Sequence, residues 1–239
     1  MPKFLKAKST SYGHWLLLVQ AVAVAVVLAA ASPATARTIR LVVLGDSLTA
    51  GLGLPPGKAF PDRLQGALRA RGWDVDVLNA GVSGDTAADG LARYDWAVPA
   101  NADALIIELG ANDMLRGLEP EATKKALSAI LDKAHAARLP TLIAGMRGAP
   151  NLGAEYDRAF DAIYPALAND HDVALYPFFL DGVAGDPKLN QADGMHPTAE
   201  GVDAIVERIA PSVEEILKQV KQWRRQLQAS PLRSRLPPP

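Results

Sequence analysis

Thr38-Ile-Arg-Leu-Val-Val-Leu44 is a short apolar run, rich in β-branched residues, that stops at Gly45. Such a run is typical of a strand buried on both faces of a parallel sheet. Similar runs predict further strands at 75–78, 104–109, 141–144 and 173–176. Helical spacing of apolar residues predicts helices between and after them, at 60–71, 86–95, 120–137, 154–168 and 197–228. This alternation predicts an α/β fold with three layers, a doubly wound and mostly parallel five-stranded sheet.

The first 36 residues have the pattern of an export signal. Three lysines precede an apolar run over 15–31, and Ala34-Thr35-Ala36 fits a small-x-small cleavage site. We therefore expect a signal peptide over 1–36, cleaved after Ala36, and a periplasmic or secreted protein. An uncleaved anchor stays open, although the run falls just short of the roughly 18 apolar residues of a spanning helix.

The remaining chain is predicted to hold one domain over 37–217 and a basic, proline-rich extension over 218–239. The extension is expected to be partly disordered and to make at most weak contact with an anionic membrane surface. Loss of three lysines with the signal changes the net charge from −1 to −4, which argues against nucleic-acid binding. The chain has no cysteine, which excludes disulfides and a thiol nucleophile.

Polar residues follow the first predicted strand in Gly45-Asp46-Ser47-Leu48-Thr49. A serine at the carboxyl end of a parallel strand can present its hydroxyl at the edge of the sheet where such folds bind ligands. Ser47 is thus a candidate nucleophile. The tripeptide also occurs in ordinary turns, and Thr49 replaces the second glycine of a Gly-x-Ser-x-Gly elbow.

A candidate base lies in Asp193-Gly194-Met195-His196-Pro197. A serine hydroxyl needs a base to take its proton, and a histidine needs a partner that holds its other ring nitrogen. Asp193 can reach the ring of His196 three residues later, and Pro197 favours an extended backbone before a helix. A helix-capping aspartate beside a solvated histidine is the structural alternative.

Two further strand ends offer hydrogen-bond donors to an oxyanion. Gly81 closes the second strand and could bring its N–H close to a ligand, and Asn112 follows the third strand and could offer its amide. Each is also an ordinary turn residue when taken alone.

These four blocks, in this order, resemble those of the SGNH (GDSL) hydrolases. The similarity extends to about Lys218, and 109–117 and 176–179 resemble most a bacterial periplasmic subgroup with thioesterase, lysophospholipase and arylesterase activities. The resemblance implies a flavodoxin-like fold, Ser47 as nucleophile, His196 as base and Asp193 as its partner. It also implies an oxyanion hole of Ser47, Gly81 and Asn112, with no metal or cofactor.

The expected substrate is a small-molecule ester or thioester of an acyl chain, and the protein is expected to act as a monomer. Apolar residues of three loops, at 114–118, 146–152 and 178–180, suit a groove for the acyl chain. Asp46 and Asp113 are expected to set loop geometry, and His135 and His171 to be solvated.

Three alternatives remain at this stage. A carbohydrate acetylesterase could use the same catalytic residues. A metal-dependent phosphohydrolase could use Asp46, Asp113, Asp193 and His196, although such sites usually collect several histidines. A phosphate-binding loop at 51–58 is disfavoured, because its glycines are six residues apart and Ala59 replaces Ser or Thr.

Overall fold

The computed structural model of the chain describes residues 37–229. Its five strands form one parallel sheet in the order β2-β1-β3-β4-β5, which is the flavodoxin-like order. The strands are β1 (Ile39–Gly45), β2 (Val75–Gly81), β3 (Ala104–Glu108), β4 (Thr141–Ala144) and β5 (Ala174–Tyr176). The predicted fold class and all five strands are confirmed.

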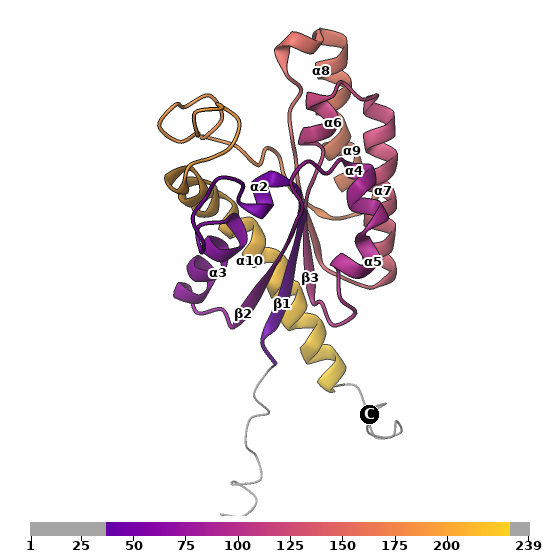
Figure 1. The fold of residues 1–239 in the computed structure, drawn as a ribbon. Helices are drawn as coiled ribbons and strands as arrows, with labels where there is room; N and C mark the ends of the chain where they lie inside the picture. Colours follow the sequence, from indigo (N-terminus) through magenta and orange to yellow (C-terminus); the bar gives the residue numbers. More distant parts are fainter. Residues whose placement is uncertain (1–36, 230–239) are drawn as a thin grey trace, which may run out of the picture. The chain divides into compact units, whose positions relative to one another are not determined.

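Helices cover both faces of the sheet. Helices α3 and α10 pack on one face, and α4, α7 and α9 lie on the other (Figure 1). The helical elements are α2 (Ser47–Ala50), α3 (Phe60–Ala70), α4 (Ala87–Ala92), α5 (Tyr94–Ala97), α6 (Ala111–Leu115), α7 (Pro120–Ala136), the 3₁₀ turn η1 (Pro150–Leu152), α8 (Ala154–Asp161), α9 (Ile163–Asp170) and α10 (Ala199–Ala229). Residues 41–44 of β1 are fully buried between these layers, as the apolar run predicts.

Two predicted helices are each divided in two. The segment expected at 86–95 becomes α4 and α5, with Arg93 between them at φ −100° and ψ 1°. Its buried guanidinium donates to the Gly45 carbonyl oxygen and pairs with Asp85, so a contact with β1 accompanies the break. The segment at 154–168 becomes α8 and α9, which meet at Ala162.

Two short helices were not predicted, and both follow strands at the functional edge of the sheet. Helix α2 has four residues and α6 has five, too few for a 3.6-residue period to appear in the sequence. They carry Ser47 and Asn112, respectively.

Helix α10 crosses the expected domain boundary at 217/218 without interruption and ends at Ala229. Val220 is buried beyond that boundary, and Pro211 lies within the helix. The expected disorder of the extension therefore does not begin at residue 218. The predicted signal peptide, residues 1–36, and residues 230–239 lie outside the described residues. Within residues 37–229, no helix is long and apolar enough to cross a membrane.

Candidate active site

Ser47 is the first residue of α2, immediately after β1. The turn is tight: a Cβ atom on Gly45 would lie 2.1 Å from Thr49 Oγ1 and 2.6 Å from Glu108 Oε2, so only glycine fits there. Asp46 caps the helix, since its Oδ1 accepts the Leu48 N–H at 2.9 Å. A residue at the start of a helix has no intrahelical acceptor for its N–H, so the Ser47 N–H is available near its own hydroxyl.

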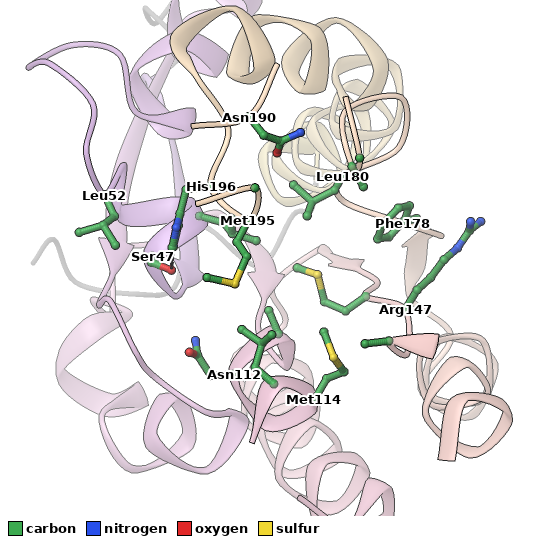
Figure 2. A pocket seen from close by; sticks show the side chains of 18 of the residues that line it. Ser47, Leu52, Asn112, Met114, Arg147, Phe178, Leu180, Asn190, Met195 and His196 are labelled. Carbon is green, nitrogen blue, oxygen red and sulfur yellow. Dashed lines mark hydrogen bonds between the residues drawn. The ribbon is translucent and has the colours of Figure 1, made fainter. Parts of the chain in front are cut away.

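His196 lies between Ser47 and Asp193. Its Nε2 is 2.9 Å from Ser47 Oγ, and its Nδ1 is 2.7 Å from Asp193 Oδ2. Because a carboxylate only accepts hydrogen bonds, Nδ1 carries the proton and Nε2 accepts from the serine hydroxyl. The two predicted motifs, 149 residues apart in sequence, thus meet at the carboxyl edge of the sheet (Figure 2).

Asp193 is held by its own loop. Its Oδ1 accepts the N–H groups of Met195 at 2.9 Å and His196 at 3.0 Å. These backbone hydrogen bonds, followed by that of the His196 ring, lower the pKa of Asp193 to about 2. Asp193 is therefore ionised throughout the pH range in which a histidine exchanges its proton.

The histidine loop is tied to the start of α10. The Gln191 N–H donates to the His196 carbonyl oxygen at 2.7 Å, and Asn190 and Pro197 form an isolated antiparallel bridge. Thr198 then caps α10, with its hydroxyl accepting the Gly201 N–H at 3.2 Å. Pro197 precedes the helix but does not open it as predicted, because α10 begins two residues later, at Ala199.

Gly81 is poorly placed as an oxyanion donor. Its N–H donates to Asn79 Oδ1 at 2.9 Å, and the residue does not line the cavity at Ser47. Glycine is needed there for packing, since a Cβ atom would lie 2.4 Å from the Ala50 nitrogen of α2. The sequence-based choice of Gly81 is corrected on these grounds.

Gly84, rather than Gly81, has the position and the free N–H expected of an oxyanion donor. It lines the cavity together with Ser47 and Asn112, and its N–H donates to no acceptor within residues 37–229. Its φ of +92° favours glycine, and its carbonyl oxygen accepts from Arg116 at 2.7 Å. The sequence offered a sign of this role, because Gly84 lies in the polar stretch Ser83-Gly84-Asp85-Thr86, which connects a predicted strand to a predicted helix.

Asn112 lies on α6 and points its amide nitrogen toward Ser47 (Figure 2). The two amide hydrogens are engaged: Nδ2 is 3.0 Å from Asp46 Oδ2 and 3.0 Å from the Asp85 carbonyl oxygen. The structure brings Asn112 into the same cavity as Ser47 and His196, as the sequence predicts.

A mainly apolar cavity of about 450 Å³ opens beside Ser47. In Figure 2 it extends from Ser47 past Met114 toward Phe178 and Leu180. Of the residues predicted for an acyl groove, those lining it are Met114, Leu115, Met146, Phe178 and Leu180.

Some groove predictions were wrong and some residues were missed. Phe179 is fully buried and packs edge-on against Phe60 with ring centroids 5.0 Å apart, so it belongs to the core. Leu48, Leu52 and Met195 line the cavity without having been predicted. Their presence depends on how the loops meet, which no local pattern encodes.

Arg147 contributes a positively charged side chain to the wall of the cavity. Its guanidinium carbon lies 4.7 Å from the centroid of the Phe178 ring, within the range of a cation–π contact. The side chain is exposed at the far end of the groove from Ser47 (Figure 2).

A pair of buried carboxyl groups, Asp46 and Glu108, lies behind the nucleophile. Burial raises the pKa of Asp46 to about 6, and the hydrogen bonds from Leu48 and Asn112 act in the opposite direction. Burial, and next the neighbouring Asp46, raise the pKa of Glu108 well above 4.5. Glu108 Oε2 also accepts the Thr49 hydroxyl at 2.6 Å. Both shifts favour the protonated forms of these carboxyl groups, so the pair retains protons at a higher pH than two exposed carboxylates would.

We expect Glu108→Gln to change how stability depends on pH. The pKa of Glu108 is raised on folding, so the wild type loses stability as the pH rises above the unfolded value near 4.5. The glutamine side chain does not titrate, so the stability of the variant lacks this dependence on pH. The free energy of unfolding of the variant minus that of the wild type should rise with pH by up to about 1.4 kcal/mol per unit. Urea denaturation from pH 4.5 to 8 measures this difference, with Glu207→Gln as the control for loss of one charge. A difference that falls with pH would contradict the expectation.

A second Ser–His–Asp group occurs elsewhere. Ser128 Oγ is 2.9 Å from His171 Nε2, so the expectation of a solvated His171 was wrong, while His135 is exposed as expected. His171 Nδ1 is 3.6 Å from Asp132, too far for a hydrogen bond. Ser128 lies inside α7, where its N–H belongs to the helix. This group lacks the free backbone donors that surround Ser47.

Two of the aspartates considered for a metal site accept hydrogen bonds from the protein instead. Asp113 accepts the Ala87 N–H at 2.8 Å and the Thr123 hydroxyl at 3.0 Å, as expected of a residue that sets loop geometry. Asp46 holds Leu48 and Asn112. Among residues 37–229, no three carboxylate or histidine side chains gather as metal ligands.

Most of the described chain is similar to a known protein family. Residues 43–204 match the model of the GDSL-like lipase/acylhydrolase family. The chain belongs to this family. Esterase TesA of Pseudomonas aeruginosa is 40% identical over 178 residues, which cover 74% of this chain and 89% of that protein.

Two other members of the GDSL family are informative. Thioesterase 1/protease 1/lysophospholipase L1 of Escherichia coli is 36% identical over 178 residues, covering 74% of this chain and 84% of that protein. The crystal structure of AlinE4, an SGNH-hydrolase family esterase, superposes with a TM-score of 0.65 at 44% identity and covers 77% of this chain and 99% of its own. The family resemblance inferred from the sequence is confirmed.

Proposed function

We propose that the protein is a serine hydrolase that cleaves carboxylic esters and thioesters through an acyl-enzyme on Ser47. The observation that carries the proposal is His196, held at 2.9 Å from Ser47 Oγ and 2.7 Å from Asp193. Membership of a family whose curated relatives are named esterase and thioesterase supports the same reaction class.

The proposed reaction has two halves. Ser47 Oγ attacks the acyl carbon while His196 Nε2 takes the hydroxyl proton. The tetrahedral intermediate collapses, the C–O or C–S bond breaks, and the leaving group departs with that proton. A water molecule then attacks the acyl-enzyme, giving one proton to Nε2, which returns it to Ser47 Oγ as the carboxylic acid is released. Asp193 stabilises the imidazolium in both halves.

The proposed oxyanion hole consists of the Ser47 N–H, the Gly84 N–H and the Asn112 amide. Three donors from the ends of β1, β2 and β3 would meet the charge that develops on the carbonyl oxygen. All three residues line the same cavity.

Asn112→Ala is expected to lower kcat by about 10²- to 10³-fold with a smaller change in KM, as for loss of one oxyanion donor. Steady-state kinetics with p-nitrophenyl butyrate measures both constants. An effect on KM alone would mean that Asn112 binds substrate in the ground state.

The proposed substrate carries a medium or long acyl chain. The groove walls contributed by Met114, Met146, Phe178 and Leu180 are apolar, whereas a sugar site would be expected to show polar side chains and exposed aromatics around the serine. Trp96 is exposed but does not line the cavity. The competing carbohydrate acetylesterase is therefore less well supported.

Chain-length dependence tests this assignment. Each buried methylene contributes about 0.8 kcal/mol, so four extra carbons that fit the groove should raise kcat/KM by roughly 10²-fold. The measurement is kcat/KM for p-nitrophenyl and CoA esters from acetyl to palmitoyl, with acetylated xylan as the competing substrate. Leu180→Ser should reduce the long-chain rates more than the acetyl rate. A maximum at acetate, or faster turnover of the xylan, would contradict the acyl-groove assignment.

We further propose export to the periplasm or the medium, action as a monomer, and no nucleic-acid partner. The lysines and apolar run of residues 1–36 and their Ala-Thr-Ala site support export. N-terminal sequencing of the protein from a cell envelope fraction should give Arg37 as the first residue. Retention of Met1 in the membrane fraction would instead support an anchor.

A further inference from the structure

Three polar groups meet at the Asn112 side chain: its own amide, the Asp46 carboxylate and the Asp85 carbonyl. They come from the ends of three neighbouring strands, β3, β1 and β2. The Asn112 nitrogen lies 3.0 Å from both acceptors. The orientation of the Asn112 amide is therefore set by hydrogen bonds to residues of two other segments.

We propose that Asp46 is a positioning residue of the oxyanion hole, whose carboxylate holds the Asn112 amide with its nitrogen toward the reacting carbonyl. This rests on the proposed role of Asn112 as an oxyanion donor. A flipped amide would bring its oxygen against two acceptors and leave both without a hydrogen, which is costly at a buried site.

Asp46 is suited to this task by its surroundings. It is fully buried, and its other oxygen is held by the Leu48 N–H at 2.9 Å. Its carboxylate plane is thus fixed by the same helix that presents Ser47. Because the start of α2 and the Asn112 amide both donate to the Asp46 carboxylate, this carboxylate fixes the position of the oxyanion donor relative to Ser47.

The two hydrogen bonds of the amide differ in strength. The bond to Asp46 is to a charged acceptor, and such bonds are stronger than bonds to a neutral carbonyl. The hydrogen that faces the Asp85 carbonyl is therefore the one that the oxyanion takes, while the hydrogen bond to Asp46 persists through the reaction.

The test is a double-mutant cycle between residues 46 and 112. Asp46→Asn presents an NH₂ group to Asn112 and should turn its amide over. Asp46→Ser keeps an oxygen that can cap α2 but is too short to reach Asn112. Both variants should lower kcat with p-nitrophenyl butyrate by about 10²-fold with little change in KM, as for a misplaced catalytic group. Each combined with Asn112→Ala should be no more than about threefold slower than Asn112→Ala alone.

Glu108→Gln provides the control for a change in the buried charge beside Asp46, since Glu108 is equally buried and has no hydrogen bond to Asn112 within residues 37–229. Its effect on kcat should be smaller than that of Asp46→Ser. Circular dichroism and thermal melting establish that each variant is folded; if Asp46→Asn does not fold, Asp46→Ser decides.

Three outcomes would overturn the proposal. The effects of Asp46 and Asn112 substitutions could multiply, Asp46→Ser could retain the wild-type kcat, or Glu108→Gln could lower kcat as much as Asp46→Ser. A normal kcat for Asn112→Ala alone would instead refute the oxyanion role on which the proposal rests.

Discussion

Ser47→Ala is expected to lower kcat by about 10⁶-fold, because a methyl group cannot attack a carbonyl and His196 has no proton to take. The fold should be retained, since Ser47 makes its side-chain hydrogen bond to His196 alone among the described residues. The residual rate should come from the oxyanion donors and the groove.

The second Ser–His pair supplies a matched control. Ser128 lies as close to His171 as Ser47 does to His196, at 2.9 Å in each case. Ser128→Ala should leave kcat within about twofold of the wild type, as for a surface substitution outside the site. A serine-directed phosphonate should add its mass to the peptide that contains Ser47. Labelling of Ser128, or full activity of Ser47→Ala, would refute the assignment.

Asp193→Asn is expected to lower kcat by about 10⁴-fold. The N–H groups of Met195 and His196 fix the oxygen of the side chain at 2.9 and 3.0 Å, so the new NH₂ group must face His196 Nδ1. Nδ1 then accepts, the ring proton moves to Nε2, and the base toward Ser47 is lost. The variant also removes the charge that stabilises the imidazolium.

Kinetics across pH measures this effect, with Asp132→Asn beside His171 as the control. Because the pKa of Asp193 is lowered to about 2, the wild-type carboxylate should not lose activity by its own protonation above about pH 4. A near-normal kcat for Asp193→Asn would mean that another group orients His196.

The strands could be predicted because each is a local pattern. A parallel strand buried on both faces must be apolar on both, so the runs of β1, β3 and β4 can be recognised without any neighbours. The edge strands β2 and β5 are only partly buried, but each still contains a short apolar run. The Asp193–His196 pair could be predicted for the same reason, since its members are three residues apart and joined within one loop.

The choice of Gly81 over Gly84 shows where local pattern fails. Both are glycines near the end of β2, and the sequence offers the same argument for either. The Asn79 side chain occupies the Gly81 N–H, whereas Gly84 reaches the cavity through a loop with positive φ. Which of the two N–H groups is free therefore depends on the path of the loop after β2 in three dimensions.

The amino-acid sequence by itself therefore determined the layered parallel sheet, through short-range periodicity, and the pairing of Asp193 with His196, through adjacency. It also singled out Ser47 as a candidate nucleophile at the end of the first strand. Only the tertiary structure brought Ser47 and His196 together across 149 residues, and it likewise placed Ser128 of the predicted helix beside His171. It likewise decided the turn of the Asn112 amide, which depends on Asp46 and Asp85 from two other strand ends. Packing of the sheet brings these ends together, and hydrogen bonds between segments distant in sequence leave no local trace.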